Sequence, residues 1–183
     1  MKTFAYPEMY REIAADNLGV FFDYGVNFCH YDIDSLFELF LDSGCANQFE
    51  NGSPRVLIGM SGIELCHDIF VKTDQTIPVS DYPTSMHRSA EYWTGWILSQ
   101  YQWYSCKTFK DIYTCVKISE LLALYYPLHE AHEFKTFKML DKKLSICGQT
   151  LYNTINQDDE IVTIATPQLH VEINIPNATE KER

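Results

Sequence analysis

The sequence lacks the patterns that identify several common classes of enzyme and membrane protein. No stretch approaches the roughly 18 apolar residues that a membrane span needs. The first residues carry charges and no apolar run of the signal-peptide kind, so we expect a cytoplasmic protein without a membrane partner. A Gly-x-Ser-x-Gly motif is absent, and Gly59–Gly62 has neither the lysine nor the spacing of a phosphate-binding loop.

Paired cysteines are missing as well. The chain has 6 cysteines, and no two of them form a Cys-x-x-Cys motif, which excludes the usual zinc-finger spacing. Because we expect a reducing compartment, the cysteines are predicted to be free and mostly buried thiols, not a disulfide framework.

Basic residues are absent from a long part of the N-terminal half. The net charge is −11, and no lysine or arginine lies between Arg11 and Arg55, where eight acidic residues fall. Such a segment repels phosphates, so direct nucleic-acid binding by it is disfavoured, whereas a basic partner surface would be attracted. The alternative is a solvated acidic face that only confers solubility.

What the sequence does contain is helical periodicity almost throughout. Predicted helix N-caps are Asp32 or Asp34, Ser61, Ser89, Thr108 and Ser119. The stretch EIVTIATPQLHVEINI alternates and is β-branched, which favours a hairpin with a turn at residues 166–168. The predicted fold is mainly α: a compact multi-helix domain over residues 1–144, and a C-terminal extension over 145–183 with a small β-hairpin and a frayed end.

The stretch SAEYWTGWILSQYQWY, residues 89–104, holds all 3 tryptophans. Large aromatic residues on every side of a helix favour a central, mostly buried position. Gly95 in mid-helix costs about 1 kcal/mol relative to alanine, so we expect close packing against another helix there. The alternative is an exposed aromatic platform that binds a ligand.

Two stretches carry candidate site residues. Asp34, Glu38 and Asp42 recur every four residues, which places three carboxylates along one stripe of a helix. In LHEAHEF, His129 and His132 are three apart and would share a helical face, as two metal ligands need. The stretch is not a His-Glu-x-x-His motif, so a capping or packing role is favoured over metal binding, and no cofactor is expected. If the protein is an enzyme, the candidate catalytic residues are His129, Glu130 and Glu133.

The region from Tyr10 to Leu144 resembles a family of small acidic proteins found in Firmicutes, their phages and other mobile elements. The motifs that carry the resemblance are Asp23-Tyr24, Gln48-Phe49-Glu50, Gly59–Gly62, Glu91–Trp96, Tyr101–Trp103 and Leu128–Ala131. The family usually has aspartate where this chain has His132, which argues against a general metal site. The extension after residue 145 is not part of the common pattern.

The family includes type II-A anti-CRISPR proteins, which inhibit Cas9 nucleases. The resemblance therefore implies a Cas9 or Cas9–guide RNA complex as the partner, contacted by acidic residues that suit a positively charged nucleic-acid channel. The candidate partner-binding residues are Asp32, Asp34, Glu38, Asp42 and Glu50. Two alternatives stay open: an antitoxin-like module that neutralises a basic partner, and a metal-dependent nuclease that acts on the guide RNA. A homodimer is also open.

Overall fold

Helices α1 (Arg11–Asn27) and α6 (Ala90–Ser105) cross closely at the centre of the protein. The structure is a computed structural model that describes residues 3–77 and 88–164, with side chains for 3–77 and 88–150. A Cβ atom at Gly95 would lie 2.2 Å from the Leu18 carbonyl oxygen and 2.7 Å from a ring carbon of Phe22. Glycine is therefore required at this crossing, which confirms the predicted close packing.

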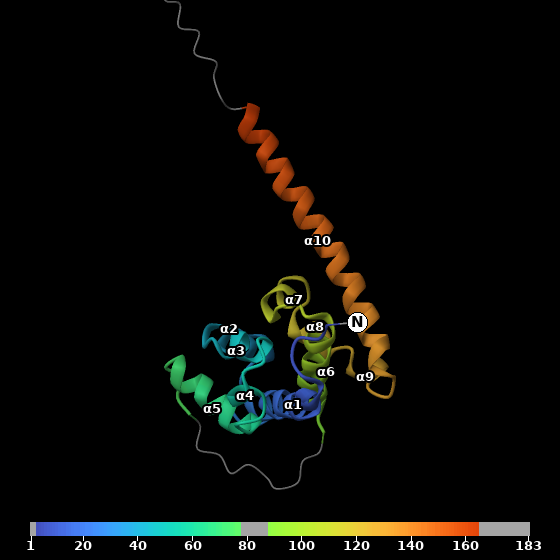
Figure 1. Cartoon of the computed structure of the whole chain (residues 1–183). Coiled ribbons are helices and arrows are strands. Elements are labelled where there is room, and N and C mark those ends of the chain that lie inside the picture. Colours follow the sequence, from blue (N-terminus) through green and yellow to red (C-terminus); the bar gives the residue numbers. More distant parts are fainter. Residues whose placement is uncertain (1–2, 78–87, 165–183) are drawn as a thin grey trace, which may run out of the picture. The chain divides into compact units, whose positions relative to one another are not determined.

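Short helices surround the crossing (Figure 1). In chain order they are η1 (Glu8–Tyr10), α2 (Ile33–Asp42), α3 (Cys45–Glu50), α4 (Pro54–Leu57), α5 (Gly62–Lys72), α7 (Phe109–Cys115), α8 (Ile118–Leu122) and α9 (Tyr125–Leu128). The chain continues into the long helix α10 (Glu133–Ile164). The prediction of a mainly helical, multi-helix fold is confirmed, and the described residues contain no strand. One compact unit ends at Gly148 and a second begins at Gln149.

Local capping signals start most of these helices. The Asp32, Ser61, Ser89 and Thr108 side chains each accept a hydrogen bond from the backbone N–H three residues later, as predicted. Ser61 and Glu64 form a reciprocal capping box. The prediction of Ser119 as a cap was wrong, because α8 begins at Ile118 and its N-terminus is held from elsewhere in the chain.

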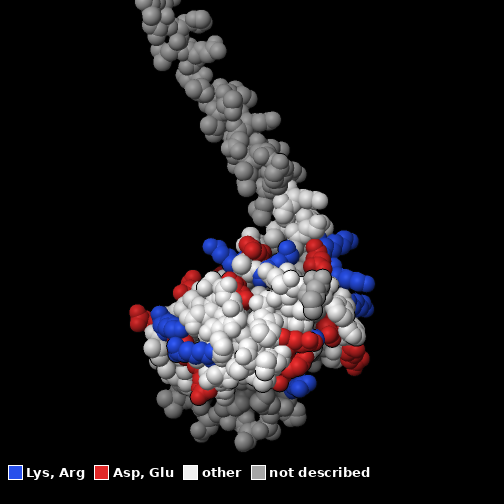
Figure 2. Space-filling model, viewed as in Figure 1, with Lys and Arg blue, Asp and Glu red and all other residues white. Residues whose placement is uncertain are grey.

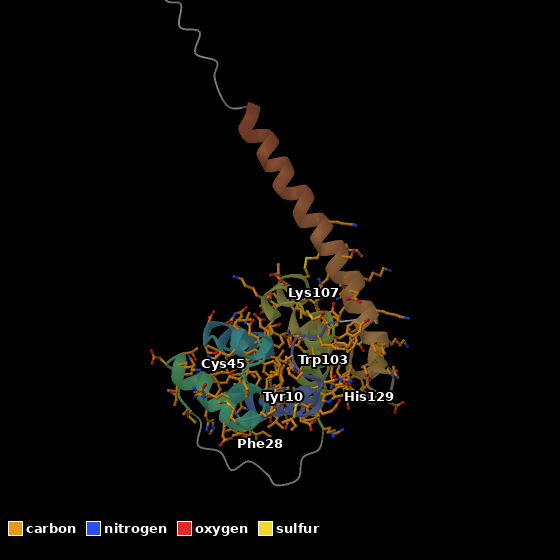
Figure 3. The ribbon with its side chains drawn as sticks, in the orientation of Figure 1. Tyr10, Phe28, Cys45, Trp103, Lys107 and His129 are labelled. Carbon is orange, nitrogen blue, oxygen red and sulfur yellow. A yellow bond between two sulfur atoms is a disulfide. The ribbon has the colours of Figure 1, made fainter. Side chains whose placement is uncertain are left out.

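Aromatic side chains make up a large part of the core, and several of them pack edge to face. The fully buried phenylalanines are Phe21, Phe22, Phe37, Phe40, Phe49, Phe70 and Phe109. Within α6, Tyr101 and Trp103 are buried, and the Trp103 indole N–H donates to the Tyr6 carbonyl oxygen at 2.8 Å. Trp103 lies among the helices in Figure 3. Helix α6 is thus the central, mostly buried helix that the sequence predicted, although Trp93 and Trp96 are only half-buried.

A disulfide joins Cys115, at the end of α7, to Cys147 in α10, with their Cα atoms 5.6 Å apart (Figure 3). Cys29, Cys45 and Cys66 are buried free thiols, and Cys106 is exposed. The expectation that all the cysteines are free was therefore wrong for this pair. The two residues are 32 apart in the sequence, so only the folded arrangement of α7 and α10 brings them together.

The predicted β-hairpin is not supported. Its first residues, 160–164, are the last residues of α10, and residues 165–183 lie outside the described part of the chain. Extending an existing helix needs no new nucleus, so the β-branched residues at 161–164 continue α10 despite their strand propensity. Although α10 is 32 residues long, no helix in the described part of the chain combines the length and apolar character of a membrane span.

Replacing Gly95 should destabilise the fold strongly. The substitution Gly95→Ala places a methyl group against the Leu18 carbonyl, and we expect a loss of about 2–4 kcal/mol in the free energy of unfolding. Gly148→Ala is the matched control, because nothing lies within 4 Å of a Cβ there, and a helical alanine should be neutral or stabilise by up to about 1 kcal/mol. Urea denaturation measures both, and equal stabilities for the two variants would contradict the close crossing.

Reducing the disulfide should lower stability without unfolding the chain. Closing a loop of this length is worth about 4 kcal/mol in the chain-entropy treatment. We expect Cys115→Ser, or a reductant, to lower the free energy of unfolding by about that amount, and Cys106→Ser to leave it unchanged. Thiol titration of the unreduced, denatured protein should find 4 free thiols, and a finding of 6 would show that the bond does not form.

Candidate functional site

The acidic stripe on α2 makes contacts within the protein. An Asp34 carboxylate oxygen accepts hydrogen bonds from the backbone N–H groups of Ile118 at 2.7 Å and Ser119 at 3.3 Å. These are the first N–H groups of α8, which have no partner inside that helix and favour a negative charge. Asp34 is thus the cap of a helix that lies more than 80 residues away in the sequence.

Glu50 and Glu38 act in a similar way on α7. A Glu50 oxygen accepts from the backbone N–H of Phe109 at 2.8 Å, at the start of α7. Near the other end of that helix the Tyr113 hydroxyl donates to Glu38 at 2.7 Å, and the Lys117 ammonium lies 3.9 Å from the same carboxylate. Burial, and then the hydrogen bond to Glu38, raises the pKa of Tyr113. Two of the five predicted partner-binding residues therefore hold α7 in place.

The remaining two predicted residues lie at the ends of α2. Asp32 accepts from the Ser35 backbone N–H at 2.9 Å and from the Ser35 hydroxyl at 3.1 Å, and these bonds lower the pKa of Asp32. Asp42 is exposed at the C-terminal end of the helix. Although Glu38 is bonded to Tyr113, its side chain is still 56% exposed. Asp32, Glu38 and Asp42 are thus the predicted residues with exposed side chains.

Figure 2 shows how charge is distributed on one face of the protein. Acidic and basic side chains are interspersed around a largely uncharged centre, so the acids do not gather into one patch on this face. In the acidic segment (residues 12–54), Glu12 and Asp16 on α1 are exposed in addition to the residues of α2.

The predicted histidine pair does not share a helical face. His129 follows the end of α9, and α10 begins only at Glu133, so residues 129–132 form a connection between two helices. His129 stacks on Tyr125 with ring centroids 4.4 Å apart, and His132 stacks on Phe134 at 5.2 Å. The described residues contain no group of three or more histidine, cysteine or acidic side chains placed to hold a metal ion.

Glu133 is anchored by a residue that is 122 positions away in the sequence. Its carboxylate lies 3.1 Å from the guanidinium of Arg11, at the start of α1. The same guanidinium donates to the Gln100 side chain and lies over the Trp103 ring, 5.0 Å from its centre. This partly buried network joins the N-termini of α1 and α10 to the C-terminal half of α6.

The half-buried tryptophans of α6 open onto a cavity of about 280 Å³, which we call the aromatic cavity. It is lined by Arg88, Tyr92, Trp93, Trp96, Ile97, Tyr125, Leu128, His129, Ala131, Glu133 and Thr136. The Trp93 and Tyr125 rings meet edge to face at 5.8 Å. Figure 3 places His129 beside the start of α10. The cavity combines aromatic walls with a few polar groups, as small ligand sites do.

The two sequence motifs that line this cavity were recognised in the sequence, but the sequence did not predict that they lie together in the fold. The Glu-Tyr-Trp-x-Gly-Trp and Leu-His-Glu-Ala motifs supply most of its lining, although they lie about 30 residues apart. Two of the candidate catalytic residues, His129 and Glu133, line it, whereas the Glu130 side chain is 90% exposed and does not.

Removing two carboxylates from the same helix should have different effects on stability. Asp34→Ala leaves the first N–H groups of α8 without their acceptor, and we expect a loss of about 1–2 kcal/mol in the free energy of unfolding. Asp42→Ala removes an exposed charge at the unfavourable end of the helix dipole and should change stability by less than about 0.5 kcal/mol. Urea denaturation compares the two, and equal losses would argue against the capping role of Asp34.

Comparison with models of known protein families, with curated proteins and with solved structures gives no significant match for this chain. The resemblance to the acidic phage-associated family therefore rests on the motifs themselves. In the structure those motifs supply parts of the core, the carboxylate at the start of α7 and the wall of the aromatic cavity.

Proposed function

We propose that this chain is an inhibitor that binds a basic protein partner, and that the partner is a type II-A Cas9 nuclease or its guide RNA complex. The observation that carries the proposal is the acidic segment, where eight acidic residues occur without a lysine or arginine. An acidic surface of this kind competes for sites that normally hold nucleic acid. The motif resemblance supplies the identity of the partner, and binding would take place in the cytoplasm of the bacterial host.

The predicted acidic residues differ in how accessible they are to a partner. Asp34 and Glu50 are only partly exposed, and each carboxylate is already bonded to a helix N-terminus. Asp42 and the exposed part of Glu38 can meet a partner without breaking a bond within the chain that fixes a helix. The proposed contact is therefore centred on the C-terminal half of α2, with Asp32 at its edge.

Association with Cas9 should depend on charge at Asp42. We expect Asp42→Lys to slow association by about tenfold at low salt, and the difference should shrink as salt rises, because steering by exposed charges is screened. Glu130→Lys makes the same change in net charge at an exposed site outside the acidic segment, and it should have little effect. Adding Glu38→Gln to Asp42→Lys should slow association further while keeping an acceptor for Tyr113.

These effects are measured by co-elution with purified Cas9 and by association kinetics on immobilised Cas9, each with and without guide RNA. Inhibition of DNA cleavage by the wild-type chain is the functional readout. If neither Cas9 form co-elutes with the wild-type chain at moderate salt, the partner is wrong. If Asp42→Lys and Glu130→Lys behave alike, the acidic segment is not the contact.

A further inference from the structure

The aromatic cavity has walls of the kind that bind organic cations. Trp93, Trp96 and Tyr125 present indole and phenol rings, whose faces attract positive charge, and Trp is the strongest of these. Because the rings are half-buried, a cation against them would be partly desolvated, which strengthens the attraction.

Acidic and basic groups both lie around this wall, and the lining itself holds one of each, Glu133 and Arg88. Glu133 lines the cavity, and Arg11 binds its Oε1 atom, while its Oε2 atom lies 3.7 Å from His132. The Oε2 atom can therefore accept another hydrogen bond. On the other side the Tyr92 hydroxyl donates to Asp16 at 2.6 Å. Glu12 adds a third acid next to Arg11, and Arg88 is the one lysine or arginine among the described lining residues.

Two arginines of the chain itself place their guanidinium groups in or next to the aromatic cavity. The Arg88 guanidinium lies over the Tyr92 ring, 5.5 Å from its centre, at the exposed side of the cavity. Arg11, close behind the cavity, combines the two contacts that a guanidinium prefers, a carboxylate at 3.1 Å and an indole face at 5.0 Å. Trp96 and Glu133 supply an indole ring and a carboxylate to the lining of the cavity itself.

We infer that the aromatic cavity is a socket for an arginine side chain of the basic partner. This inference deepens the proposed function and rests on it for the existence of that partner. The incoming guanidinium lies against Trp93 or Trp96 and donates to Glu133. The Arg88 side chain is displaced by it, because Arg88 is exposed and its contact here is with the face of the Tyr92 ring. Arg88 is thus a competitor for the site.

A nucleotide is the other ligand that aromatic walls suggest, since bases stack on such rings. Its phosphate would meet the carboxylates of Glu133 and Asp16, with Arg88 as the nearby compensating charge. The two ligands make opposite demands on Arg88: a nucleotide needs it, whereas an arginine side chain is hindered by it.

The test uses the full chain and a Gly/Ser peptide with a single arginine, and follows the three indole N–H signals by NMR. We expect saturable shifts of the Trp93 and Trp96 signals and none of Trp103, which is buried and bonded to Tyr6. The same peptide with citrulline, a neutral isostere of arginine, should bind about tenfold more weakly. Equal binding of the two peptides, or tighter binding of adenosine monophosphate, would overturn the inference.

Variants separate the socket from general effects on folding. Glu133→Gln and Trp96→Leu should each weaken peptide binding by about tenfold, whereas the exposed controls Glu130→Gln and Tyr126→Leu should not. Arg88→Ala should strengthen binding two- to threefold, a gain that a misfolded variant cannot produce, and weaker binding would contradict the competitor role. The peptide test contains no Cas9, so its outcome is separate from that of the Cas9 experiments. If the chain binds the arginine peptide but does not co-elute with Cas9, only the proposed partner is refuted. If the Trp96→Leu variant still inhibits Cas9, only the socket is refuted.

Discussion

The close crossing of α1 and α6 is the constraint on which the rest of the structure depends. At Gly95 the two helices approach until a single methyl group would overlap the Leu18 carbonyl oxygen. Gly62 brings α5 equally close to α1, because a Cβ there would lie 2.3 Å from the Asn17 carbonyl oxygen. Both contacts fix backbone against backbone, so the flanking aromatic side chains can pack in defined positions on either side of α1.

Acidic side chains then bond the outer helices to this centre and to one another. Tyr92, Tyr101 and Tyr113 donate to Asp16, Asp141 and Glu38 respectively, at 2.6–2.7 Å. Asp34 accepts a hydrogen bond from the N-terminus of α8, and Glu50 accepts one from the N-terminus of α7. A charged acceptor makes each of these bonds stronger than a neutral one. Much of the acidity that suggests a basic partner therefore also stabilises the fold, and the side chains left for a partner are fewer than the net charge implies.

How far the sequence predicts the structure depends on the range of the interaction. Asp32, Ser61, Ser89 and Thr108 were predicted as caps, because each binds a backbone group three residues ahead. Asp34 was assigned to a surface stripe from its helical spacing, yet its partners lie in α8. Spacing specifies the face of a helix but not what packs against it. The Cys115–Cys147 bond and the aromatic cavity were missed for the same reason.

Helix α6 also explains why an aromatic-rich stretch can serve both folding and binding. In the C-terminal half of α6, Tyr101 and Trp103 are buried, and the Tyr101 hydroxyl and the Trp103 indole N–H are bonded within the chain. In the N-terminal half, Trp93 and Trp96 are half-buried and line the aromatic cavity together with residues of α9 and the first turn of α10. Close packing of α1 against Gly95 holds α6 rigid, so these rings are preorganised. A wall that is already held in place loses little conformational entropy when a ligand binds, and this favours recognition at the cavity.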